Sequence, residues 1–298
     1  MQEKTLIAKD KYILHLDIYE NDNPLGYIQI IHGMQEHKSK YTSLAEFLCE
    51  RGYTVIVSNI RGHGKDAPIL NYFKDKDGYK YLLSDQEQIT QYIFDTYQTD
   101  KVILLGHSMG TLIARNLLQT ESNNYEKIIL TGSPSPQRLT NLGLILTNII
   151  KIIKGPKYYS RFIEKIIFHK LSKNIKNPKT NIDWLNYNEK SITECMSDKY
   201  SKKGFTVSAY NDLFHLLKNM TKINKCTNIN YNLPILLLRG DSDPCTGTEQ
   251  ENNKTIKLLK KSGFNNIKDK KYQHMRHNIL TEVEHEKVYQ DIITFLNN

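Results

Sequence analysis

The sequence predicts an α/β protein with a mostly parallel central sheet, helices on both faces of that sheet and a helical insertion. Short runs of β-branched and aliphatic residues, typical of strands buried on both faces, alternate with segments of helical periodicity. From residue 134 to about residue 232 this alternation stops, and helical patterns and polar loops remain. We therefore expect residues 1–133 and 233–298 to form an α/β core. Residues 134–232 are expected to form a helical cap over the site, or else an ordinary helical layer elsewhere on the core.

The individual elements are predicted from hydrophobic periodicity and from helix start and stop signals. Strand patterns occupy residues 11–19, 26–31, 54–58, 101–105, 127–131, 234–240 and 266–272. The first of these alternates between apolar and polar side chains, which is typical of an antiparallel edge strand. Helix patterns occupy residues 41–51, 84–97, 111–118, 139–154, 158–171, 249–261 and 284–296. The second helix is predicted to begin at the capping box Ser84-Asp85-Gln86-Glu87.

Composition restricts the classes of function. The chain of 298 residues has a formal net charge of +9 but no zinc-finger, RNA-binding or helix-turn-helix pattern, so we expect no nucleic-acid partner. Its four cysteines have no metal-binding spacing and suit reduced thiols. The sequence has no N-terminal signal pattern and no apolar run long enough to cross a membrane. We therefore expect a cytoplasmic protein, with its positive charge spread over a solvated surface.

A pentapeptide of the form G-x-S-x-G, residues 106–110, lies between an expected strand and an expected helix. This context is that of the nucleophile elbow of an α/β-hydrolase. The turn must hold the serine oxygen exposed and leave the next backbone N–H free for an oxyanion. Gly106 and Gly110 lack Cβ atoms, so strand and helix can approach closely there. Ser108 is therefore the predicted nucleophile, followed by the N–H of Met109.

A His-Gly step follows the expected strand at residues 26–31. In α/β-hydrolases the second oxyanion donor comes from this place in the chain. Gly33 permits a tight turn, after which the N–H of Met34 would point at the oxyanion. We expect the side chains of His32 and His37 only to brace the loop through hydrogen bonds.

An acidic residue and a histidine complete the pattern near the end of the chain. Asp241 and Asp243 follow the second-last expected strand, and His277 follows the last one. The histidine would take the serine proton, and a carboxylate would fix the imidazole tautomer. Composition alone does not choose between the two aspartates, although Pro244 restricts the backbone of Asp243 and fixes its direction. The order nucleophile, acid, base is that of α/β-hydrolases.

Taken together, these residues resemble the monoacylglycerol lipase and lysophospholipase group of α/β-hydrolases, a serine aminopeptidase S33-like family. The resemblance covers nearly the whole chain, and the matching segments are 32–37, 44–48, 52–55, 61–64, 106–110, 183–185, 205–206, 240–243 and 275–280. It implies an α/β-hydrolase fold with Ser108 as nucleophile, Asp243 as acid and His277 as base. It also implies that the backbone N–H groups of Met34 and Met109 form the oxyanion hole.

This sequence departs from the family pattern at two places. Asn59 stands where the family usually has aspartate, and we expect only a structural effect. The expected cap lacks the Asp-Pro-x-Cys-Gly motif that usually precedes the family's equivalent of Phe205-Thr206. Because the cap sets the substrate in this family, the second departure bears on substrate identity.

The predicted function is a serine ester hydrolase that cleaves a single-chain lipid ester, a monoacylglycerol or a lysophospholipid, through an acyl-enzyme on Ser108. A general carboxylesterase or an aminopeptidase-like amidase with the same triad is the alternative. A further alternative is a non-catalytic, ligand-binding protein with the hydrolase fold. An epoxide hydrolase or a dehalogenase is not expected, because those enzymes need an aspartate nucleophile at the position of Ser108. No cofactor and no metal are expected, because no carboxylate or cysteine cluster completes a site with His274 and His277.

The helix pattern at residues 139–154 has a wide apolar face and lysines on its polar stripe. This is the pattern of a helix at a membrane interface. We expect Ile149 and Ile153 to form part of an acyl-binding wall and the helix to touch membranes transiently, which would make the protein peripheral at the membrane. A buried cap helix is the alternative. Cys245, two residues after the predicted acid, is expected to be a free thiol near the site.

Overall fold

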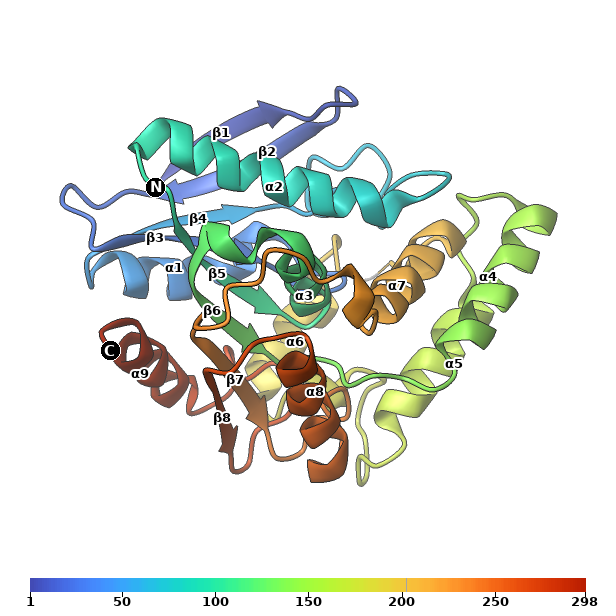
Figure 1. Cartoon of the computed structure of the whole chain (residues 1–298). Helices are drawn as coiled ribbons and strands as arrows, with labels where there is room; N and C mark the ends of the chain where they lie inside the picture. The colour runs from blue at the N-terminus through green and yellow to red at the C-terminus, as the bar shows by residue number, and fades with distance from the viewer. Residues whose placement is uncertain (202) are drawn as a thin grey trace.

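A computed structural model describes residues 1–201 and 203–298 of the chain. Within these residues the centre is an eight-stranded sheet of order β1-β2-β4-β3-β5-β6-β7-β8 (Figure 1). Its strands are β1 (Gln2–Ile7), β2 (Ile13–Tyr19), β3 (Gly26–Ile31), β4 (Tyr53–Ser58), β5 (Val102–His107), β6 (Tyr125–Thr131), β7 (Ile235–Gly240) and β8 (Ile267–Tyr272). β1 and β2 pair antiparallel with their neighbours. The other strands, β3 to β8, run parallel to one another.

Two apolar layers hold helices against opposite faces of this sheet. Helices α1 (Thr42–Cys49) and α9 (His285–Leu296) pack in one layer, whereas α2 (Gly78–Tyr97), α3 (Met109–Glu121) and α8 (Glu249–Lys261) pack in the other. Successive residues of β5 alternate between the layers, with Leu104 in one and Leu105 in the other. Every residue of β5 is buried. The turn that follows β5 is therefore held by a strand packed on both of its faces.

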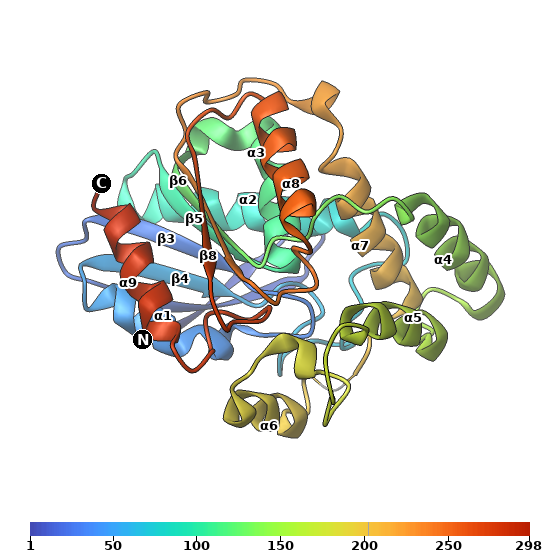
Figure 2. The same ribbon diagram turned by 90° about the horizontal axis from the view of Figure 1, so that it is seen from below.

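Between β6 and β7 lies a segment that we call the helical insertion. It contains α4 (Thr140–Lys154), α5 (Arg161–Ser172), α6 (Glu189–Ser197) and α7 (Val207–Asn219). Figures 1 and 2 both show α4 and α5 on the side of the molecule away from α9 and the C-terminus. Helix α7 contacts α2 and α3 of the core as well as α4. Over residues 1–201 and 203–298, no helix has the length and apolar character needed to cross a membrane.

The predicted strands and helices are present with shifted ends, but two expectations are wrong. β1 was not expected, because most of its side chains are exposed and show no apolar alternation. Since β1 pairs with β2, residues 11–19 do not form the edge of the sheet. Helix α2 begins at Gly78 rather than at Ser84. Asp85, which lies inside the expected capping box, is buried within that helix, where its Oδ2 lies 2.9 Å from Nε of Arg61.

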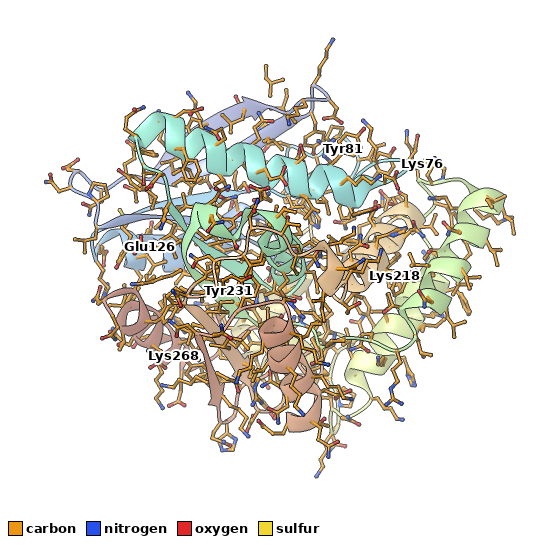
Figure 3. The ribbon with its side chains drawn as sticks, in the orientation of Figure 1. Lys76, Tyr81, Glu126, Lys218, Tyr231 and Lys268 are labelled. Carbon is orange, nitrogen blue, oxygen red and sulfur yellow. The ribbon has the colours of Figure 1, made fainter. Side chains whose placement is uncertain are left out.

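The positive charge comes from many parts of the fold. Figure 3 labels Lys76 before α2, Lys218 on α7 and Lys268 on β8, which lie in three separate regions of the molecule. Lys76 and Lys268 are exposed, and Lys218 is partly exposed. These positions agree with the expected solvated surface.

Candidate active site

The turn between β5 and α3 holds Ser108 in a strained backbone conformation. Its φ is 50° and its ψ is −115°, a combination that residues other than glycine rarely adopt. A Cβ on Gly106 would lie 2.8 Å from the carbonyl oxygen of Gly110, and one on Gly110 would lie 2.1 Å from that of Ile31. Glycine is therefore needed at both positions for β5, α3 and β3 to approach this closely. The geometry is that of a nucleophile elbow.

Loops that follow β5, β7 and β8 bring Ser108, Asp243 and His277 into hydrogen-bond contact. Nε2 of His277 lies 2.7 Å from Oγ of Ser108, and its Nδ1 lies 2.9 Å from Oδ1 of Asp243. With the imidazole proton on Nδ1, that nitrogen donates to the carboxylate and Nε2 accepts from the serine hydroxyl. The structure thus joins the three residues whose types and order suggested a triad.

Of the two aspartates left open by composition, Asp243 is the one that meets His277. Its Oδ1 also accepts the backbone N–H of Cys245 at 2.8 Å, which fixes the carboxylate. Asp241 is exposed, and its Oδ1 accepts the hydroxyl of Ser242 at 3.0 Å. The different positions follow from the turn after β7, which points one carboxylate inward and the other to solvent.

Burial and mutual contact act in opposite directions on the pair of Asp243 and His277. Burial would lower the pKa of His277, but contact with the Asp243 carboxylate and with Cys245 outweighs burial and raises that pKa well above its ordinary value of 6.5. Burial would raise the pKa of Asp243, but the charge of His277 and its hydrogen bond lower it. The carboxylate is therefore ionised at neutral pH, and the imidazole is a stronger base than free histidine.

The two backbone N–H groups expected to bind an oxyanion are available. Met34 lines the cavity that contains Ser108. Met109 is the first residue of α3, so its N–H has no acceptor within the helix. In the described part of the chain, neither N–H donates to a backbone carbonyl.

The partly buried carboxylate of Glu36, for which the sequence suggested no role, braces the loop after β3. Its Oε2 accepts the N–H of Gly33 at 2.6 Å and the hydroxyl of Tyr41 at 2.7 Å. Its Oε1 lies 3.4 Å from Nδ2 of Asn278 and 3.9 Å from Nε2 of His107. Gly33, His107 and Asn278 directly adjoin the expected oxyanion donor, nucleophile and base in the chain. The only sequence signal was an acidic residue three positions after the glycine of the loop.

The two loop histidines and Asn59 have the structural roles expected of them. Nε2 of His32 accepts the N–H of Ile60 at 2.9 Å, and Nε2 of His37 lies 2.8 Å from a carboxylate oxygen of Asp198. Oδ1 of Asn59 accepts the backbone N–H of Lys38 at 2.8 Å. These contacts hold the loops around the site in place.

A cavity of about 690 Å³ opens at Ser108 and His277. The helical insertion supplies most of its apolar wall, which includes Phe168, Ile182, Trp184, Leu185, Ile192 and Met196. The rings of Trp184 and His277 lie 5.2 Å apart. The cavity therefore has a reactive polar end on the core and an apolar wall on the insertion.

Helix α4 does not reach this cavity, so the expectation that Ile149 and Ile153 form an acyl-binding wall is corrected. Neither is among the lining residues found in the described part of the chain, and they are 50% and 68% exposed. The buried residues of α4 are Thr140, Leu144 and Thr147 instead. The physical reason is a polar contact with α7, in which Nδ2 of Asn211 donates to Oγ1 of Thr147 at 2.8 Å. The apolar face of α4 consequently points outward.

Cys245 is a free thiol beside the triad residues, as predicted. Its Sγ, a carboxylate oxygen of Asp243 and a ring nitrogen of His277 all lie within 4.8 Å of one another. Burial raises the pKa of the Cys245 thiol, although the charge of His277 opposes the shift. The thiol is therefore protonated at neutral pH and is a poor nucleophile.

Comparison with known proteins places the chain in a family. The family described as "Serine aminopeptidase, S33" matches residues 22–284. The chain belongs to this family of hydrolases. Phospholipase YtpA of Bacillus subtilis (strain 168) is 24% identical to it over 274 residues, which are 91% of this chain and 95% of the relative. A monoacylglycerol lipase of Mycolicibacterium smegmatis is 24% identical over 138 residues, which are 46% of this chain and 48% of the relative.

The fold is also that of solved hydrolases. A thermostable carboxyl esterase from Bacillus coagulans, crystallised with glycerol, superimposes with a TM-score of 0.91 at 21% identity. The match covers 99% of this chain and 97% of the esterase. The predicted α/β-hydrolase fold and the predicted family are therefore confirmed.

Proposed function

We propose that the protein is a serine hydrolase that cleaves the ester bond of single-chain lipids, monoacylglycerols or lysophospholipids, through an acyl-enzyme on Ser108. The observation that carries this proposal is the hydrogen-bonded chain from Oγ of Ser108 through His277 to Asp243. A free serine hydroxyl is a weak nucleophile. An imidazole that is oriented by a carboxylate removes the hydroxyl proton during attack.

Each triad residue has one role in the proposed reaction. Oγ of Ser108 attacks the ester carbonyl carbon while Nε2 of His277 takes the hydroxyl proton, and Asp243 stabilises the resulting imidazolium. The N–H groups of Met34 and Met109 donate to the oxyanion of the tetrahedral intermediate. His277 then protonates the leaving alcohol. Water repeats the same steps on the acyl-enzyme and releases the fatty acid.

The cavity favours a substrate with one apolar chain. Its volume of about 690 Å³ is within the range of small-ligand sites, and its apolar wall begins beside the reactive residues. An ester bond at Ser108 would place the acyl chain along Phe168 and Trp184. The relatives named phospholipase and monoacylglycerol lipase support the same substrate class.

The outer face of the helical insertion supports contact with a lipid surface. The exposed apolar side chains on α4 and α5 are Leu142, Ile145, Ile149, Ile152, Ile153, Phe162 and Ile166. Soluble proteins rarely expose so many large apolar side chains together. Lys151 and Lys154 stand in the last turn of α4, where they would attract anionic head groups. In this proposal the protein is cytoplasmic and binds the membrane surface transiently.

A fluorophosphonate probe tests the nucleophile. The intact protein is treated with the probe, and the labelled peptide is identified by mass spectrometry, with Ser108→Ala as the control. We expect labelling at Ser108 that disappears in the variant. An unlabelled, folded wild-type protein would instead identify a non-catalytic ligand-binding protein.

A substrate panel tests the substrate class. Turnover is compared for p-nitrophenyl esters of increasing chain length, a monoacylglycerol, a lysophospholipid and an aminoacyl amide. We expect the highest kcat/KM with one of the two lipids. A preference for short esters would identify a general carboxylesterase, and a preference for the amide would identify an aminopeptidase-like enzyme.

A further inference from the structure

The side of His277 that faces away from Ser108 carries a set of metal-ligand atoms that the proposed reaction does not use in full. The thiol of Cys245, the carboxylate of Asp243 and a ring nitrogen of His277 lie within 4.8 Å of one another. Over residues 1–201 and 203–298, this is the one such group of three or more His, Cys, Asp or Glu side chains. The expectation that no carboxylate or cysteine cluster completes a site with His277 is therefore wrong, because the turn after β7 brings Asp243 and Cys245 to this histidine. Thiolate, imidazole and carboxylate are the ligands that Zn²⁺ prefers in proteins.

A second observation points to a cation at the same place. Oδ1 of Asp243 accepts from His277 and from the N–H of Cys245, but Oδ2 is buried and has no hydrogen-bond partner among the described residues. Asp243 as a whole is 3% exposed. An unpaired oxygen on a buried carboxylate is unfavourable. A positive ion bound there would remove that cost.

We propose that Asp243, Cys245 and His277 bind Zn²⁺ and that binding switches the hydrolase off. The metal takes Nδ1 of His277, Sγ of Cys245 and a carboxylate oxygen of Asp243, with water as the remaining ligand. Cys245 releases its thiol proton to solvent, and the single imidazole proton moves from Nδ1 to Nε2. Nε2 then donates a hydrogen bond and cannot take the proton of Ser108.

The inhibited and active states exclude each other because both use Nδ1. In the active state Nδ1 donates its proton to Asp243 across 2.9 Å. In the zinc-bound state the same nitrogen is a metal ligand and has no proton to donate. Zinc at this site is therefore an inhibitor and has no part in ester cleavage. The inhibitory half of the inference rests on the proposed function, whereas the binding half does not.

Zinc binding is tested first by equilibrium dialysis of the full-length protein against Zn²⁺ alone. We expect wild type to bind a single Zn²⁺ and both Cys245→Ala and His277→Ala to lose at least roughly 10- to 100-fold in affinity. That is the loss typical of a partner that only supports a ligand, and these variants remove a ligand itself. Cys226→Ala removes a thiol elsewhere and is the matched control, which should bind as wild type does. Equal zinc affinity in wild type and Cys245→Ala would overturn the site.

Inhibition is tested by titrating Zn²⁺ into the hydrolysis of a soluble p-nitrophenyl ester. The proposed reaction does not use the thiol of Cys245, and Cys245→Ala keeps the backbone N–H that binds Asp243. Inhibition is measured against each protein's own zinc-free rate. The zinc concentration for half-inhibition of Cys245→Ala should exceed that of wild type by the same factor as the dissociation constants from dialysis. Zinc that binds wild type without slowing turnover would refute the switch. If Cys245→Ala does not fold, Cys245→Ser replaces it in both assays. If wild type hydrolyses no ester, dialysis still decides the binding half, so the two failures are distinguishable.

Discussion

Helices α4 and α7 belong to the same insertion and are both amphipathic, yet they bury different shares of their apolar side chains. α7 packs Val207, Tyr210 and Leu216 into the main apolar layer of the core. α4 buries Leu144 between Thr140 and Thr147, and five of its eight leucines and isoleucines are exposed, namely Leu142, Ile145, Ile149, Ile152 and Ile153. The comparison teaches that an apolar stripe does not by itself identify the buried side of a helix.

The contact between the two helices explains the difference. A Cβ on Gly143 of α4 would lie 2.7 Å from the ring of Phe214, so this aromatic side chain of α7 rests directly on the glycine. Nδ2 of Asn211 donates to Thr147 and to Oδ1 of Asn148. The small size of Gly143 and the hydrogen bonds of Asn211 thus orient the side of α4 that faces α7. The opposite, apolar side of α4 is exposed, and we propose that it contacts a lipid surface.

The largest expected effect comes from the triad, which lies outside both α4 and α7. Ser108→Ala and His277→Ala should each lower kcat by about four orders of magnitude, because the nucleophile or the base is lost. The loss should be the same for a soluble ester and for a lipid in vesicles, with unfolding free energy near that of wild type. Near-normal turnover by His277→Ala would remove His277 as the base and make His274 the next residue to test.

The two aspartates should differ almost as strongly. Asp243→Asn should lower kcat by about 10⁴, because the amide favours the wrong imidazole tautomer. Asp241 is exposed and does not meet His277, so Asp241→Asn should cost far less. Steady-state kinetics on one soluble ester checks both variants, and the reverse order would show that the acid is misassigned.

A stability measurement separates α7 from α4. Leu216 is fully buried on α7, so Leu216→Ala should lower the free energy of unfolding by about 2–5 kcal/mol. Ile152 on α4 is 83% exposed, and Ile152→Ala should change it by less than about 0.5 kcal/mol. Urea unfolding of both variants measures the difference. Similar losses in the two helices would mean that the outward face of α4 is buried in the folded protein.

A smaller, pH-dependent effect concerns the attachment of α7 to the core. Asp212 of α7 lies against Gly78 at the start of α2, where burial raises its pKa to about 7. Lys151 opposes that shift and Asp77 adds to it. Because the folded pKa exceeds the ordinary 3.8, this carboxyl contributes most to stability below pH 3.8, and the contribution is lost as pH rises through 7.

Asp212→Asn keeps the shape of the side chain without the charge. It should therefore stabilise the protein at pH 8 by roughly 1–3 kcal/mol and have little effect at pH 4. Thermal unfolding at the two pH values measures this. A variant that is less stable than wild type at pH 8 would show that the charged carboxylate is favourable at the start of α2.

The core and the triad could be predicted from sequence because their signals are local or depend on chain order. A buried strand, two glycines and a serine define the elbow, and Asp243 and His277 follow later strands. The role of Glu36 could not be predicted, because it arises from contacts with residues as distant as Asn278. β1 was missed for a different reason, since a strand with exposed side chains needs no apolar pattern.

The orientation of α4 could not be predicted from the sequence of this helix alone. Its periodicity correctly predicted a helix with one apolar face. Which face is buried depends on Asn211 and Phe214, more than 60 residues further along the chain. For that reason Ile149 and Ile153 were expected in the cavity and are found on the surface.

The most direct test of the account compares one double variant on two substrates. Ile149→Ser combined with Ile153→Ser removes part of the outward apolar face, and Ile7→Ser, at an exposed isoleucine of β1, is the matched control. Hydrolysis is measured for a soluble p-nitrophenyl ester and for a monoacylglycerol in anionic vesicles. We predict an unchanged rate on the soluble ester and a fall of about tenfold or more on vesicles for the double variant only, because buried apolar area at the interface is lost. Equal rates on vesicles for the double variant and wild type, or equal losses on both substrates, would contradict a core that performs the chemistry and an α4 face that contacts lipid.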